Sequence, residues 1–189
     1  MRKSMMLLVL GVSSPLALPA AAQEDGAASS SIVHSIVGGV LAHDTGPLTY
    51  PVEDGVDING EVQFTPFGFE EWGWIGAPRP HLGGTVSTSG DTSQIYGGLT
   101  WGIELLDGIT LDGSAGLMAH NGNTGAFDPD RRSLGSRVLF RFSLEAGYRF
   151  AEHHGISLYA SHSSHAGWFD DDNAGLEDVG VRYHYYFGR

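Results

Sequence analysis

Apolar and polar positions alternate with a period of two along most of the chain. In residues 138–150, "VLFRFSLEAGYRF", one parity is wholly apolar, and the other is charged, polar or small from Arg141 onward. A period of two is typical of a β-strand whose two faces meet different environments, whereas a helix repeats every 3.6 residues. The pattern therefore predicts a strand in this segment.

Similar alternation recurs along the rest of the chain, so about eight strands are expected. The other segments are 56–64, 79–88, 95–105, 109–120, 155–164 and 177–187, with a first one near 34–43. The phase of the first segment stays open because both of its parities are apolar, and Met118 breaks the alternation of its segment. No segment has a helical pattern.

The connections and the second face of the strands favour a membrane barrel over a soluble sandwich. Short turns such as "LLDG" alternate with long connections such as "HNGNTGAFDPDRRSLGS", as in outer-membrane barrels. Gly, Ser and scattered charges such as Arg141 and Glu145 occupy the second face, which suits a narrow interior better than a water-facing surface. The sequence predicts an all-β fold, an eight-stranded antiparallel transmembrane β-barrel of the outer membrane, with a periplasmic sandwich as the alternative.

An eight-stranded barrel is filled by its own side chains, so it is not expected to be a pore. The aromatic run "RYHYYF" near the C-terminus is typical of a strand that ends at a membrane interface. Function is therefore expected on the loops, at the rim or on the lipid-facing wall.

The N-terminus has the features of an export signal. Arg2 and Lys3 precede the apolar run "MMLLVLGVSSPLAL", and small residues follow at 20–22. The run is too short and too broken for a membrane helix, so residues 1–22 are predicted to be a cleaved signal peptide and 23–189 the barrel domain.

Composition excludes some classes of function. The chain has a net charge of −12, and its single lysine, Lys3, lies in the predicted signal. Nucleic-acid binding normally requires a basic surface, so no nucleic-acid partner is expected. The chain has no cysteine, which excludes a disulfide-stapled scaffold.

Strand parity sorts the dense polar stretch "SHSSHAGWFDDDNAGLE" at 161–177. His162 and Ser164 continue the apolar, outward parity of the seventh strand, and Glu177 continues that of the eighth. Because the two strands are antiparallel neighbours, the three side chains are expected at the same end of the outer surface.

Polar side chains that face lipid are costly and usually have a function. Serine, histidine and an acid together supply a nucleophile, its base and the group that orients the base. The simpler alternative is that all three residues mark the end of the membrane band, where polarity returns.

At these residues the chain resembles the lipid A 3-O-deacylase (PagL) family. Its signature is His-x-Ser-Asn, then Asn-x-Gly-x-Glu or Asp, then a terminal aromatic strand. Here the corresponding residues are "HSSH" at 162–165, "NAGLE" at 173–177 and "VRYHYYF" at 181–187. The detailed match is confined to this C-terminal region.

The resemblance implies hydrolysis of an acyl ester of lipid A, in the lipopolysaccharide of the outer leaflet, without a metal or other cofactor. It implies that Ser164 is the nucleophile, His162 the base and Glu177 the acid. Asn173 would support the oxyanion with backbone N–H groups near His165 and Gly167. The family usually has Asn where this chain has His165, so only a backbone role is expected there.

Other interpretations of the same residues remain open. The acidic run 170–173 could bind calcium, although the spacing of a calcium loop is missing. His162 and His165 are separated by three positions and so point to opposite faces of a strand, which argues against a shared metal. A phospholipase-type esterase and a non-enzymatic structural barrel are the rival functions, and a homodimer is one open oligomeric state.

Overall fold

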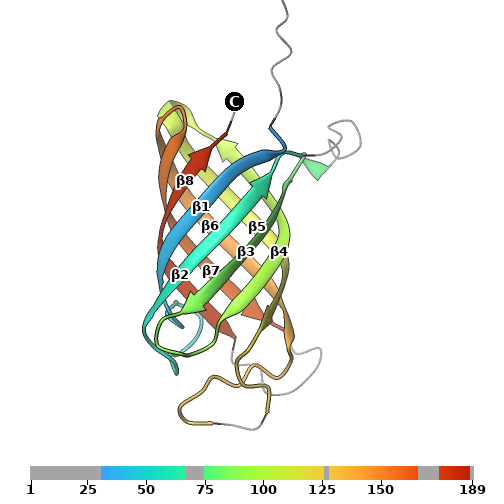
Figure 1. The fold of residues 1–189 in the computed structure, drawn as a ribbon, viewed down its shortest axis with the longest axis vertical. Helices are drawn as coiled ribbons and strands as arrows, with labels where there is room; N and C mark the ends of the chain where they lie inside the picture. The colour runs from blue at the N-terminus through green and yellow to red at the C-terminus, as the bar shows by residue number, and fades with distance from the viewer. Residues whose placement is uncertain (1–30, 67–74, 126–127, 166–174, 188–189) are drawn as a thin grey trace, which may run out of the picture.

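The described residues of the computed structural model form one closed antiparallel barrel (Figure 1). They are residues 31–66, 75–125, 128–165 and 175–187. The strands are β1 (Val33–Ala42), β2 (Val56–Phe64), β3 (Arg79–Ser87), β4 (Gln94–Glu104), β5 (Ile109–His120), β6 (Val138–Ala151), β7 (His154–Ser164) and β8 (Leu176–Tyr186). A short 3-10 turn, η2 (Leu106–Gly108), joins β4 and β5. The predicted eight-stranded barrel is confirmed, and the sandwich alternative is wrong.

The barrel closes where the last strand pairs with the first. The register runs from Ser35 opposite Tyr186 to Ala42 opposite Val179, without a break. Every strand therefore has a hydrogen-bonded neighbour on both sides, and the sheet has no open edge. Both the beginning of β1 and the end of β8 lie at the same end of the barrel (Figure 1).

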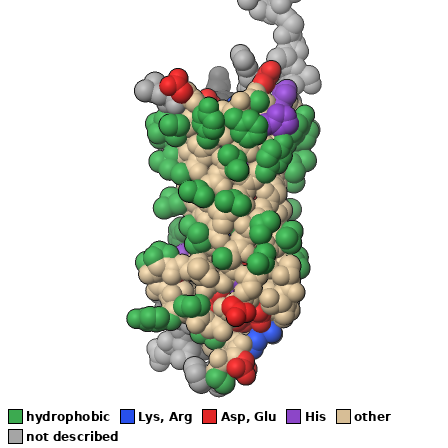
Figure 2. Space-filling model, turned by 90° about the vertical axis from the view of Figure 1, so that its left-hand side faces the viewer, with side chains coloured by type: hydrophobic (Ala, Val, Ile, Leu, Met, Phe, Trp, Pro, Cys, Tyr) green, Lys and Arg blue, Asp and Glu red, His purple; other side chains and the backbone are tan. Residues whose placement is uncertain are grey.

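The polarity of the barrel is the reverse of a soluble protein. Large apolar side chains such as Ile95, Leu144 and Leu158 are exposed on the outer wall. Most buried side chains are polar or charged, among them Glu61 and Arg182. Figure 2 shows hydrophobic side chains spread over the middle of the wall and acidic and basic ones near its ends. An exposed apolar band around a polar interior is the surface of a barrel that lies in lipid.

Among the described residues, no helix is long and apolar enough to cross a membrane.

The charged side chains inside the barrel neutralise one another. An Arg182 nitrogen lies 3.0 Å from a Glu61 oxygen, and a second lies 3.4 Å from Glu145. The Arg141 guanidinium stacks 3.6 Å from the centre of the Tyr96 ring. Buried charges are tolerated only when they are paired in this way. These side chains fill the interior, as expected for eight strands.

A small apolar cluster inside the barrel explains two irregularities of the sequence pattern. It consists of Tyr96, Met118, Leu134, Leu139 and Leu176. Met118 breaks the alternation of β5 because it points inward into this cluster. In β1, both parities are apolar because Val37 and Leu41 are buried in the interior, while the opposite parity faces outward.

The connections only partly follow the predicted alternation of lengths. Between β4 and β5, Asp107 and Gly108 have φ of 58° and 82°, a left-handed conformation that lets the chain reverse in the three residues between Leu105 and Ile109. The connection 65–78 lies at the same end as this turn but is long, whereas 88–93 at the opposite end is short. Loop length alone is therefore an imperfect guide to which end of the barrel is which.

A close approach of β4 and β5 predicts a position that cannot accept a side chain. A Cβ added at Gly116 would collide with the carbonyl oxygen of Gly97 and lie 2.8 Å from Cα of Gly98. We expect Gly116→Ala to lower the free energy of unfolding by about 1–3 kcal/mol, because only backbone atoms could move to make room. Urea unfolding in detergent micelles would measure the change.

Gly60→Ala is the matched control, since a Cβ at Gly60 meets nothing within 4 Å. Equal stability of the two variants would contradict the close-packing explanation.

Candidate active site

Two of the three residues singled out in the sequence are hydrogen-bonded to each other. His162 of β7 is directly opposite Glu177 of β8 in the strand register. Nδ1 of His162 lies 3.2 Å from Oε1 of Glu177. The imidazole is 30% exposed on the outer wall, so it is accessible from the membrane side.

Glu177 has the predicted outward parity, but it does not face lipid. The loop 43–55, between β1 and β2, covers its side chain, which is 3% exposed. The backbone N–H groups of Leu48 and Thr49 each donate a hydrogen bond of 3.0 Å to Oε2, and the Thr49 hydroxyl donates a third of 3.2 Å. The expectation that this carboxylate points into the membrane is therefore wrong.

The loop 43–55 explains how the carboxylate of Glu177 can be buried on the outer wall of the barrel. Oε2 accepts hydrogen bonds from three donors of the loop and Oε1 lies against the imidazole, so the charge is stabilised without water. The loop can approach so closely because Gly46 has no side chain, and an added Cβ would collide with the carboxylate of Glu177. Sequence reasoning missed Leu48 and Thr49, because no local pattern connects them to a residue so far along the chain.

Ser164 lies two residues after His162 on the same strand and face. It is opposite Phe140 of β6 and is partly exposed. Ser161 and Ser163, of the other parity, are buried in the interior. Strand parity therefore separated the outward serine from the two inward ones correctly.

Of the remaining predicted site residues, only His165 lies within the described part of the chain. His165 is fully buried, whereas His162 is on the outer wall. Gly167, Asn173 and the acidic run 170–172 lie outside the described residues, as does the predicted signal peptide. The oxyanion role of Asn173, Gly167 and the His165 backbone stays a prediction.

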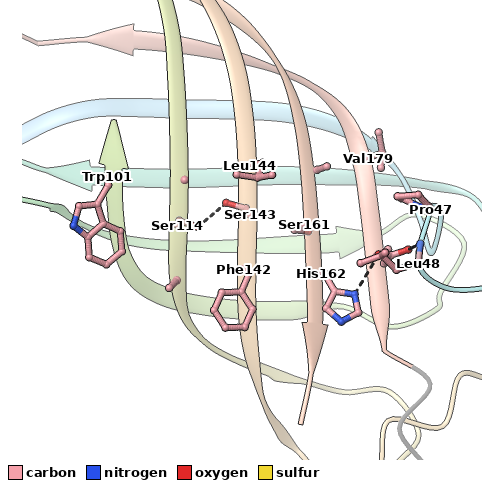
Figure 3. A pocket seen from close by; sticks show the side chains of 15 residues that line it. Pro47, Leu48, Trp101, Ser114, Phe142, Ser143, Leu144, Ser161, His162 and Val179 are labelled. Atoms are coloured by element: carbon pink, nitrogen blue, oxygen red, sulfur yellow. Dashed lines mark hydrogen bonds and ion pairs between the residues drawn. The ribbon is translucent and has the colours of Figure 1, made fainter. Parts of the chain in front are cut away.

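An apolar groove of about 520 Å³ begins at His162 and Glu177 and crosses the outer wall. Figure 3 shows Pro47 and Leu48 at one side of it and Trp101 at the other, with Phe142 and His162 between them. Small residues in the strand register form its floor, namely Gly113, Ala115 and Ala160. A hydrocarbon chain would find apolar contact along this groove, with its polar end next to the imidazole.

Comparison with known proteins identifies relatives of the whole strand region. The model of the family described as lipid A 3-O-deacylase (PagL) matches residues 58–186. A solved structure of the outer membrane enzyme PagL is 19% identical, covers 80% of this chain and 98% of its own, and superposes with a TM-score of 0.59. No curated protein matches the chain.

Two designed transmembrane β-barrels are also similar. They are 12% and 11% identical, with TM-scores of 0.44 and 0.45. They cover 80% and 88% of this chain, and 95% and 99% of their own lengths are covered.

The hydrogen bonds on Glu177 predict slow exchange of two loop amides. Glu177→Ala removes the acceptor for the N–H groups of Leu48 and Thr49, so we expect hydrogen–deuterium exchange in 44–55 to become about tenfold faster or more. Mass spectrometry of peptides from this loop would measure the rates.

Glu104→Ala, which removes an exposed acid at the opposite end of the barrel, is the control and should leave the loop unchanged. Unaltered exchange in Glu177→Ala would mean that the loop is held by other contacts.

Proposed function

Because the chain belongs to the lipid A 3-O-deacylase (PagL) family, we propose that it hydrolyses an ester-linked acyl chain of lipid A. The substrate would be lipopolysaccharide in the outer leaflet of the outer membrane. The observation that carries the proposal is the His162–Glu177 pair, which lies on the outer wall at the end of an apolar groove. That arrangement presents a base to a lipid and not to an aqueous substrate.

The geometry supports a division of roles among three residues. Nδ1 of His162 faces Glu177, which leaves Nε2 as the nitrogen available to take a proton. In the proposed reaction, Ser164 Oγ attacks the ester carbonyl while His162 Nε2 accepts the hydroxyl proton. Glu177 holds the ring in the required tautomer and stabilises the imidazolium that forms.

The attack forms a tetrahedral intermediate, and the reaction is completed in two stages. The bond to the sugar oxygen breaks, and that oxygen takes the proton from His162, which leaves the acyl chain as an ester on Ser164. Water, deprotonated by the same imidazole, attacks this ester and releases a fatty acid and free serine. Asn173 and backbone N–H groups near His165 and Gly167 are the proposed donors to the oxyanion.

The groove accounts for the choice of a lipid over a small ester. An acyl chain in the groove would contact Phe142, Leu144 and Trp101 along its length and place its carbonyl near His162. Docking the chain in a preformed groove removes much of the entropic cost of orienting the ester. The exposed apolar tip of the loop 43–55, at Leu48 and Tyr50, extends this contact toward the lipid.

Two rival functions make different predictions. A phospholipase-type esterase would use the same three residues on glycerophospholipids. A structural barrel would need none of them. The homodimer and the cleaved signal stay predictions.

Ser164→Ala should abolish deacylation while the barrel still folds, because the nucleophile is lost. We expect a decrease in rate of about 10³-fold or more, in line with losses of other catalytic serines. Mass spectrometry of lipid A from cells that express each variant would show whether one acyl chain is missing.

Ser163→Ala is the matched control, since this neighbour points into the barrel. Identical lipid A profiles with wild type and Ser164→Ala would eliminate the deacylase. Loss of acyl chains from glycerophospholipids alone would favour the phospholipase.

Filling the floor of the groove should alter selectivity for chain length. Ala160→Phe projects a ring into the groove next to Leu144 and Val179, its neighbours in the strand register. We expect hydrolysis of long-chain esters to decrease about 10-fold or more, with a much smaller change for a short-chain ester that does not reach the floor. Rates on a series of nitrophenyl esters would test this.

Val181→Phe changes the outer wall outside the groove and serves as the control. A uniform loss of activity at all chain lengths in Ala160→Phe would argue against the groove as the acyl site.

A further inference from the structure

A second cluster of reactive side chains lies inside the barrel, behind the wall that carries His162 and Glu177. His43 follows the end of β1, Asp57 is the second residue of β2, and Asp178 is next to Glu177 on β8. Nδ1 of His43 lies 2.8 Å from Oδ2 of Asp57 and 3.7 Å from Oδ1 of Asp178. One nitrogen or oxygen atom from each of the three lies within 4.8 Å of the other two.

The cluster contains buried acceptor oxygens that no described donor satisfies. Oδ1 of Asp178 points at His43 and accepts no hydrogen bond within the described part of the chain, although the side chain is only 1% exposed. Oδ1 of Asp57 and Oε1 of Gln94 are also buried and accept no hydrogen bond from the described residues. Gln94 belongs to the same group, because its Nε2 donates a hydrogen bond of 2.7 Å to Oδ2 of Asp178. Buried acceptors that converge without donors are the surroundings of a cation.

A third carboxylate prepares the histidine for such a role. Nε2 of His43 lies 2.9 Å from Oε2 of Glu53. If Nε2–H donates to Glu53, the lone pair on Nδ1 is directed at Asp57 and Asp178. A carboxylate on the far nitrogen of the ring is the usual partner of a metal-bound histidine, because it fixes the tautomer and raises the basicity of the ligating atom.

The electrostatics of the cluster require positive charge. The carboxylates of Glu53, Asp57 and Asp178 lie 2.9, 2.8 and 3.7 Å from the ring nitrogens of His43, and all of these side chains are buried. Either a proton on the ring or a metal ion beside it can supply that charge. The unsatisfied oxygens distinguish the two, since a proton on Nδ1 can be shared with Asp57 but leaves Oδ1 of Asp178, 3.7 Å from Nδ1, without a donor.

We propose that His43 Nδ1 and the carboxylates of Asp57 and Asp178 bind one divalent first-row transition-metal ion, with Gln94 Oε1 as a further oxygen ligand. One imidazole nitrogen with several oxygens suits Zn²⁺ or Mn²⁺, whereas Ca²⁺ and Mg²⁺ prefer oxygen ligands alone. The ion would join the ends of β1, β2 and β8. It would have no part in ester hydrolysis, which takes place on the other side of the wall.

The site has a structural consequence for the outer face. His43 begins the loop 43–55 that donates hydrogen bonds to Glu177, and Asp178 is the next residue after Glu177. An ion that holds both would restrict the loop and the strand that position the carboxylate. This makes the ion a stabiliser of the end of the barrel where His162 and Glu177 lie.

The test uses the full mature chain in detergent micelles after treatment with a chelator. Isothermal titration with Zn²⁺ and, separately, Mn²⁺ should show about one tight site per chain, and the thermal midpoint should rise with added ion as binding to the folded state requires. Asp178→Asn keeps the side-chain volume but loses a charged ligand, and it should bind at least about tenfold more weakly.

Asp112→Asn is the matched control, because Asp112 is a half-buried interior acid paired with Arg79 far from the cluster. If Asp178→Asn does not fold, the Mn²⁺ spectrum of the wild type provides the answer, since magnetic coupling to one imidazole nitrogen is expected. The proposal is overturned if no stoichiometric ion binds, if Asp178→Asn binds as tightly as wild type, if no imidazole nitrogen is coupled, or if only Ca²⁺ or Mg²⁺ stabilises the chain.

Discussion

The closed hydrogen-bond ladder of the wall is the constraint on which the rest of this protein depends. Hydrocarbon offers no partner to a backbone N–H or carbonyl group, so each must be paired inside the sheet. Pairing β8 with β1 achieves this for all eight strands. Once the ladder is closed, every side chain points either into a narrow interior or out into lipid. The polarity of most strand residues then follows from their parity.

The same constraint gives the outer face its chemistry. Strands in a closed barrel have little freedom to move, so the register that sets His162 opposite Glu177 also sets their distance. A low-dielectric surface strengthens their interaction but makes an uncovered carboxylate costly. The loop 43–55 resolves the conflict by covering Glu177 with backbone donors. A loop thus completes a site whose other members are on strands.

The interior meets a different requirement, because it must hold many polar groups without water-filled space. Arg182 between Glu61 and Glu145, and Arg141 stacked on Tyr96, fill the middle of the barrel with compensated charge. Toward the end where His162 lies, an apolar cluster around Met118 and the acidic groups around His43 take their place. The wall therefore separates two polar environments, one internal and one facing lipid, that meet at the neighbouring residues Glu177 and Asp178.

The amino-acid sequence by itself determined the strands and the outward parity of His162, Ser164 and Glu177. Both depend on a period of two, which is a local property of the chain. The phase of β1 and the inward turn of Met118 were decided by tertiary structure, because apolar residues are favourable both in the interior cluster and in lipid. Tertiary structure also decided that Leu48 and Thr49 cover Glu177, that the groove runs from His162 to Trp101, and that His43 meets Asp178. Those contacts join residues far apart in the chain, and they exist only because barrel closure brings β1 and β8 side by side.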